Sequence, residues 1–180
     1  MGLPNQLSVL RILLVPGIIA SLVYYSPEHD WLRLLALGLF VFGMVTDALD
    51  GFIARTQGLS SQLGALLDPI ADKILIVGTL LGCSSIKALP EWMHIPAWFN
   101  LIVLTRDALV LLGALVVFLM QGRWGLRPDL LGKFTTVAQM LVIPTVMLHW
   151  PVKDQVILTA SILTTLSAVS YLRLALRLFG

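Results

Sequence analysis

The fold of this chain is decided by residues 47–72, which read DALDGFIARTQGLSSQLGALLDPIAD. Asp47 and Asp50 end one long apolar run, and Asp68 and Asp72 begin the next. The first two are three residues apart and the second two are four apart, so each pair shares one face of a helix. The short connection predicts antiparallel neighbouring helices, and we therefore expect the four carboxylates to converge.

The composition of the 180-residue chain excludes an ordinary soluble domain. Hydrophobic residues make up 58% of it and charged residues 12%, with a mean hydropathy of +0.92. Soluble domains are about 45–50% apolar and about 25% charged, and a core of this size could not bury the excess apolar surface. The net charge of +2 is too small for a nucleic-acid-binding surface. We therefore predict an integral membrane protein that binds no nucleic acid.

Six apolar runs are long enough to cross a bilayer, because a hydrocarbon core of about 30 Å needs about 20 helical residues. Clusters of turn-forming and charged residues separate the runs. The predicted fold is therefore all-α, with six transmembrane helices in one domain that covers residues 1–180. The predicted spans are residues 7–25, 33–55, 64–86, 96–120, 132–149 and 155–179.

Six spans would place both termini on one side of the membrane. That side holds more basic residues than the other, and the positive-inside rule assigns it to the cytoplasm. We therefore expect the termini and the aspartates to face the cytoplasm. We also expect the membrane to be the bacterial inner membrane. Trp31, Trp92, Trp98 and Trp150 fall near the opposite boundary, as an interfacial aromatic belt would. The basic residues on the cytoplasmic side are Arg11, Arg55, Arg123, Arg127, Lys133, Arg173 and Arg177.

Four carboxylates at the end of apolar helices need a positive partner or must be partly protonated. Oxygen ligands in this number suit Mg²⁺ or Mn²⁺, and four aspartates can hold two such ions. Gly51, Ala54 and Gly64 lie in register with the aspartates and leave room for a ligand, while Arg55 suits a phosphate oxygen. The pattern indicates a phosphoryl-transfer site. An intramembrane cation transporter is the alternative from another functional class.

Other small residues in the third run have a structural interpretation. Gly78 and Gly82 have the Gly-x-x-x-Gly spacing that allows close helix packing. Cys83 is the single cysteine and lies in an apolar segment, so we predict a buried small hydrophobic side chain.

The eight residues Asp47, Asp50, Gly51, Ala54, Arg55, Gly64, Asp68 and Asp72 have the spacing D-x2-D-G-x2-A-R-x8-G-x3-D-x3-D. This resembles the signature of the CDP-alcohol phosphatidyltransferases. The resemblance implies transfer of a phosphatidyl group from CDP-diacylglycerol to an alcohol, with release of CMP after in-line attack. It also implies that the four aspartates hold two divalent cations and that Asp72 is the general base. Asp47, Gly51, Ala54, Arg55 and Gly64 would line the CDP pocket, and a homodimer is expected.

The acceptor alcohol is less closely defined. Asn5, Ser8 and Arg11 resemble the opening motif of phosphatidylglycerophosphate synthases, which cardiolipin synthases of the CMP-forming type share. We favour glycerol 3-phosphate, with phosphatidylglycerol as the alternative acceptor. Candidate anchors for an acceptor phosphate are Arg106, Lys133 and Arg11.

Two of these anchors have competing interpretations. Arg106 could instead form a structural ion pair with Asp107 or a neighbouring carboxylate, and Lys133 could extend to the membrane interface. Asp107 and Thr135 also stand where phosphatidylglycerophosphate synthases usually have Glu and Lys, and Arg-Asp is closer to the cardiolipin-synthase pattern. These differences keep the second acceptor open.

Overall fold

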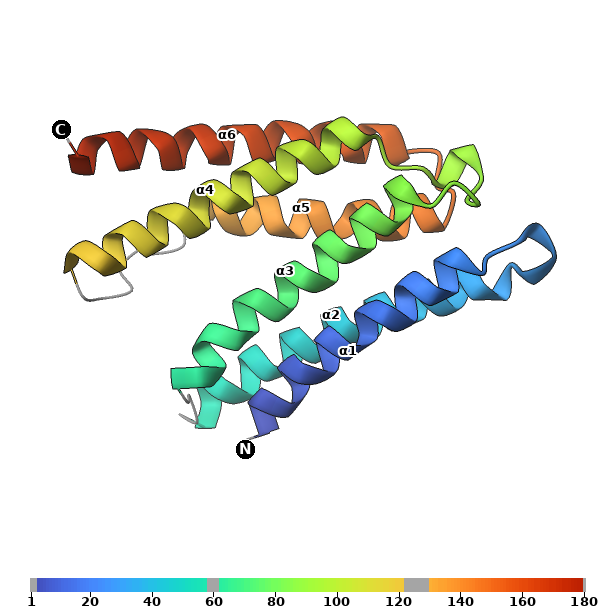
Figure 1. The fold of residues 1–180 in the computed structure, drawn as a ribbon, viewed down its shortest axis with the longest axis horizontal. Helices are drawn as coiled ribbons and strands as arrows, with labels where there is room; N and C mark the ends of the chain where they lie inside the picture. The colour runs from blue at the N-terminus through green and yellow to red at the C-terminus, as the bar shows by residue number, and fades with distance from the viewer. Residues whose placement is uncertain (1–2, 58–61, 122–129, 180) are drawn as a thin grey trace. The chain divides into compact units, whose positions relative to one another are not determined.

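The computed structural model describes the backbone of residues 3–57, 62–121 and 130–179, and side chains at 6–49, 70–113, 119 and 130–173. Within these ranges the chain forms six long helices (Figure 1), which confirms the all-α prediction. Each helix begins and ends within four residues of its predicted span. The helices are α1 (Leu3–Val23), α2 (Trp31–Gln57), α3 (Gln62–Ser85), α4 (Ala97–Gln121), α5 (Leu130–Met147) and α6 (Lys153–Phe179).

Within the part of the chain whose side chains are described, five of these helices are long and apolar enough to cross a membrane, so the chain is a membrane protein. The exception is α3, the predicted span 64–86. Side chains of this helix are described only from residue 70 to its end at Ser85, which is shorter than the about 20 residues that a span needs. The described residues therefore contain one candidate span fewer than the six predicted.

The chain forms two compact units, Met1–His94 and Ile95–Gly180. The first contains α1, α2 and α3, and the second contains α4, α5 and α6. A single domain over residues 1–180 remains a prediction, and each unit is described separately below.

In the first unit α1 contacts both α2 and α3, and glycines allow the close approach. A Cβ atom on Gly78 would lie 2.8 Å from Cγ1 of Val15, and one on Gly82 would lie 2.7 Å from Cδ1 of Ile19. The packing role predicted for the two glycines is therefore confirmed. Cys83 is fully buried, as predicted.

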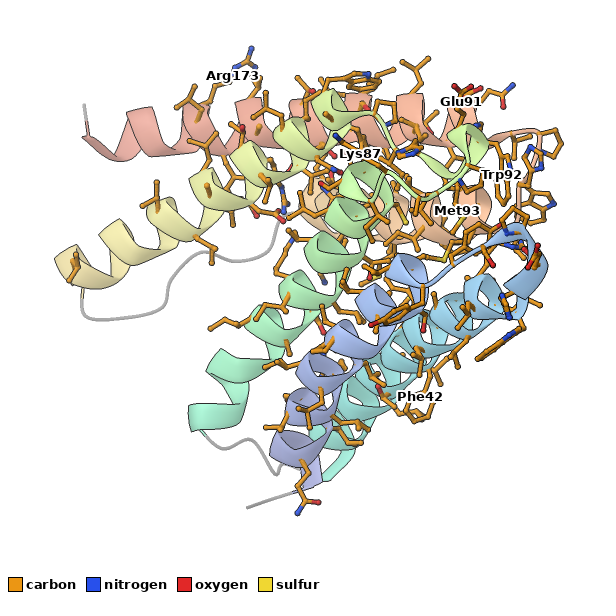
Figure 2. All side chains as sticks on the ribbon, turned by 45° about the vertical axis from the view of Figure 1, so that its right-hand side comes forward. Phe42, Lys87, Glu91, Trp92, Met93 and Arg173 are labelled. Atoms are coloured by element: carbon orange, nitrogen blue, oxygen red, sulfur yellow. The ribbon has the colours of Figure 1, made fainter. Side chains whose placement is uncertain are left out.

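The first turn of α2 contacts the connection after α3 at one end of this unit. Arg33 donates hydrogen bonds to Asp30, with Nη2 at 2.6 Å from Oδ2, and these bonds lower the pKa of the Asp30 carboxyl. The same guanidinium lies 5.8 Å from the ring centre of Trp92. Figure 2 shows Trp92 beside Glu91 in the connection that follows α3. Trp31 also lies at this end and is 59% exposed, as an interfacial anchor would be.

In the second unit α6 contacts α4 and α5. The α5–α6 interface contains polar side chains: Nε2 of Gln139 donates to Oγ1 of Thr164 at 3.2 Å, and Thr135 donates to the carbonyl of Leu163 at 3.2 Å. α5 ends at Met147 and is followed by a left-handed residue, His149 with φ 52°. The backbone N–H of Trp150 donates to the carbonyl of Thr145.

The packing of α1 on α3 predicts that Gly78→Ala lowers the melting temperature of the purified protein. The new methyl group would meet a β-branched side chain that moves little, and overpacking costs about 1–3 kcal/mol. Gly38→Ala is the matched control, because nothing lies within 4 Å of its added Cβ. Alanine is more favourable than glycine in a helix interior by about 1 kcal/mol, so Gly38→Ala should not lower the melting temperature. Equal shifts for the two variants would contradict this packing.

Candidate active site

The centre of the candidate site is a group of three charged side chains from the three helices of the first unit. Nη1 of Arg11 on α1 donates to Oδ1 of Asp47 on α2 at 2.7 Å, and the same nitrogen donates to Oδ1 of Asp72 on α3. Two carboxylates that are 25 residues apart in the chain therefore meet at a single atom. Part of the convergence predicted from helix spacing is confirmed.

A layer of close packing next to the charges fixes this arrangement. Leu14, Gly43 and Leu75 lie about one turn from Arg11, Asp47 and Asp72 along their respective helices. A Cβ atom on Gly43 would lie 2.7 Å from Cδ2 of Leu75 and 3.3 Å from Cδ1 of Leu14. The absent side chain lets α1 and α3 approach α2 at this level.

The three charged side chains differ in exposure. The side chain of Arg11 is 0% exposed, whereas those of Asp47 and Asp72 are 33% and 24% exposed. The guanidinium therefore lies on the buried side of the pair, and the accessible surface of the group belongs to the carboxylates.

The other predicted residues of this site lie in α2 and α3 where the backbone alone is described. Residue 50 follows Asp47 by about one helical turn, and residue 68 precedes Asp72 by about one turn, so each predicted pair shares a helix face. The side chains of Asp50, Gly51, Ala54, Arg55, Gly64 and Asp68 lie outside the described residues.

The described oxygens fit a divalent cation in kind and in position. Asp47 and Asp72 bring hard carboxylate ligands from two helices to one point, and both keep an accessible surface. No cluster of three or more His, Cys, Asp or Glu side chains forms among the residues that the structure describes. The described pair therefore accounts for half of the predicted ligand set.

Arg106 lies in a separate buried cluster within the second unit. Its Nη1 donates to Oδ1 of Asp107 at 2.9 Å, and its Nε and Nη2 both lie 3.2 Å from Oγ of Ser167. The guanidinium is also 5.6 Å from the ring centre of Tyr171. A Cβ atom on Gly132 would lie 3.0 Å from Nη2 of Arg106, so the glycine leaves the room that this side chain occupies.

The three predicted phosphate anchors thus have different surroundings. Arg11 is fully buried against two aspartates, Arg106 is 4% exposed and paired with Asp107, and Lys133 is exposed on α5. The ion pair that competed with the phosphate role of Arg106 is present. Sequence reasoning expected either a positive partner for the aspartates or their partial protonation, and it did not assign the partner's part to Arg11. The signal that could have found it was the position of Arg11 inside an otherwise apolar span.

Comparisons with known proteins agree with the motif. A family model described as CDP-alcohol phosphatidyltransferase matches residues 1–170. A probable phosphatidylglycerophosphate synthase of Mycobacterium tuberculosis is 35% identical over 185 residues, covering 99% of this chain and 84% of the relative. A CDP-diacylglycerol–glycerol-3-phosphate 3-phosphatidyltransferase of Pseudomonas fluorescens is 34% identical over 191 residues, covering 97% and 90%. A putative cardiolipin synthase of M. tuberculosis is 37% identical over 147 residues, covering 81% and 64%.

The candidate membrane spans and the family match together define a membrane-embedded transferase. The chain belongs to the CDP-alcohol phosphatidyltransferase family. The resemblance found at residues 47–72 is therefore confirmed over nearly the whole chain, and the protein is an enzyme of phospholipid biosynthesis.

The buried ion pair of the second unit predicts a stability effect. Arg106→Ala removes the guanidinium that neutralises Asp107, and breaking a buried pair from one side costs about 3–5 kcal/mol. The melting temperature should therefore fall. The double variant Arg106→Leu with Asp107→Leu should recover most of the loss, because replacing both charges by apolar groups is often nearly neutral. Arg173→Ala, which removes an exposed arginine of α6, is the control. An Arg106→Ala protein as stable as the wild type would contradict the structural role of this pair.

Proposed function

We propose that this enzyme transfers the phosphatidyl group of CDP-diacylglycerol to glycerol 3-phosphate, giving phosphatidylglycerophosphate and CMP. The observation that carries the proposal is the convergence of Asp47 and Asp72 within the eight-residue motif of the family. The names of the relatives that match most of the chain support the same acceptor.

Asp47, Asp50, Asp68 and Asp72 are proposed to hold two divalent cations, Mg²⁺ or Mn²⁺. Such ions neutralise a diphosphate and make its phosphorus more electrophilic when bound. Asp47 also lines the CDP pocket with Gly51, Ala54 and Gly64, where absent or small side chains leave room for the nucleotide. Arg55 binds a phosphate oxygen of the donor.

Asp72 acts as the general base. The acceptor hydroxyl attacks the phosphorus that bears diacylglycerol, and the bond from this phosphorus to the CMP oxygen breaks in line. The hydroxyl proton passes to the Asp72 carboxylate. The exposed part of that side chain gives an acceptor access to it. No covalent intermediate with the protein is required.

The phosphate of the acceptor needs a separate cationic contact, since glycerol 3-phosphate carries close to two negative charges on this group. Lys133 is exposed and is therefore the most accessible of the three predicted anchors. Arg106 remains a candidate, although it already serves Asp107 and Ser167.

The membrane arrangement is part of the proposal. The enzyme lies in the bacterial inner membrane with both termini and the aspartates on the cytoplasmic side. Basic residues at that side support this orientation, among them Arg173, which is exposed and extends away from α6 in Figure 2. A homodimer is proposed from the family resemblance alone.

A second candidate acceptor is phosphatidylglycerol, which would make the enzyme a cardiolipin synthase. The Arg106–Asp107 sequence and the putative cardiolipin synthase that is 37% identical favour it. A panel of acceptors offered to the purified protein with CDP-diacylglycerol and Mg²⁺ or Mn²⁺ decides between them. We expect phosphatidylglycerophosphate from glycerol 3-phosphate. Product from phosphatidylglycerol alone would contradict the proposed acceptor, and cation flux without CMP release would favour transport.

The role of Asp72 predicts that Asp72→Asn lowers kcat at least about 100-fold, because general-base catalysis contributes about 10²–10⁴-fold. CMP release at saturating Mg²⁺ or Mn²⁺ measures the effect. Asp154→Asn removes an exposed carboxylate at the start of α6 and should keep the wild-type rate. An Asp72→Asn enzyme with the wild-type kcat would show that a group other than Asp72 is the general base.

A further inference from the structure

Arg11 is the strongest feature that the proposed reaction leaves unused. Its guanidinium is fully buried in an apolar helix and donates from one nitrogen to two aspartates of the proposed cation site. A buried charge of this kind is retained only where a partner compensates it. Arg11 therefore belongs to the electrostatics of the acidic site.

The exposures exclude one role for Arg11 in this arrangement. A phosphate anchor must be reached by the acceptor, but the Arg11 side chain is 0% exposed and its Nη1 already serves both carboxylates. The exposed surfaces of Asp47 and Asp72 lie on the other side of the pair. A ligand that approaches from the accessible side meets carboxylate oxygens before it meets the guanidinium.

The charges define what Arg11 does to a cation site. Without Arg11, two carboxylates held together by the packing around Gly43 would repel each other. With Arg11, the repulsion falls, but a divalent cation meets a less negative site. Arg11 and the divalent cation are thus both attracted by the same two carboxylates. Each of the two positive charges therefore weakens the binding of the other.

We propose that Arg11 is a positioning residue and a built-in counter-charge. It holds Asp47 and Asp72 together in the metal-free protein. Its positive charge also makes the affinity of the site for divalent cations lower than the two carboxylates alone would give. This inference rests on the proposed function, because it takes the aspartates as cation ligands.

The test is Arg11→Gln, which keeps amide hydrogen-bond donors but removes the charge. The Kd for Mn²⁺ alone is measured by titration calorimetry in lipid nanodiscs, together with the melting temperature in EDTA. We expect a lower melting temperature in EDTA and about 5–150-fold tighter Mn²⁺ binding, the usual range for coupled sites. Arg11→Lys restores the charge and should return the Kd towards that of the wild type. A purely structural role would lower the melting temperature without changing the Kd.

Arg33→Gln is the matched control, since Arg33 also pairs with an aspartate of this unit but lies at the other end of α2. Its Mn²⁺ affinity should equal that of the wild type. Equal Mn²⁺ affinity in wild type and Arg11→Gln would overturn the role of Arg11 while leaving the cation site intact. A wild-type protein that binds no Mn²⁺ would contradict the cation site itself.

The folding of Arg11→Gln provides a second test of the counter-charge role. If Arg11→Gln folds only when Mn²⁺ is present and unfolds in EDTA while the wild type does not, counter-charge compensation is supported. A variant that is unfolded even with saturating Mn²⁺ would overturn the proposal.

Discussion

A single guanidinium between two carboxylates links the first three helices at their acidic end. Each of these charges would cost about 2.5–3.5 kcal/mol at the centre of a membrane helix. Arg11, Asp47 and Asp72 reduce that cost by sharing hydrogen bonds from one nitrogen. The positions of the helices follow from this requirement, because the three charged groups can meet only where the neighbouring layer around Gly43 packs closely. The geometry that lowers the energetic cost of the charges also brings together the carboxylates proposed to act in catalysis.

Much of this fold could be predicted from the sequence. Hydropathy and turn signals placed all six helices, and the spacing of Gly78 and Gly82 predicted close helix packing, which the structure shows between α3 and α1. These features depend on residues close together in the chain. The partner of the aspartates could not be predicted in the same way, because helix periodicity does not fix the rotation of α1 against α2 and α3. The aspartates called for a positive partner or partial protonation, and the sequence contains several basic residues that could have been that partner.

The two buried arginines show how one residue type meets different constraints. Arg11 faces carboxylates from two other helices, whereas Arg106 is paired with its own neighbour Asp107 and with Ser167 of α6. The second arrangement needs the space left by Gly132 on α5, a contact that no local sequence pattern indicates. The acidic motif was predictable because its spacing is regular. The surroundings of Arg106 depend on three helices and become visible only in the fold.

The central claim is that the aspartates of α2 and α3 form a cation-dependent phosphatidyl-transfer site. The most direct measurement is CMP release from CDP-diacylglycerol and glycerol 3-phosphate by purified protein, first in EDTA and then with Mn²⁺ or Mg²⁺ added back. The account predicts no CMP release in EDTA and full recovery of CMP release when at least one of the two cations is added back. Undiminished CMP release in EDTA would contradict it.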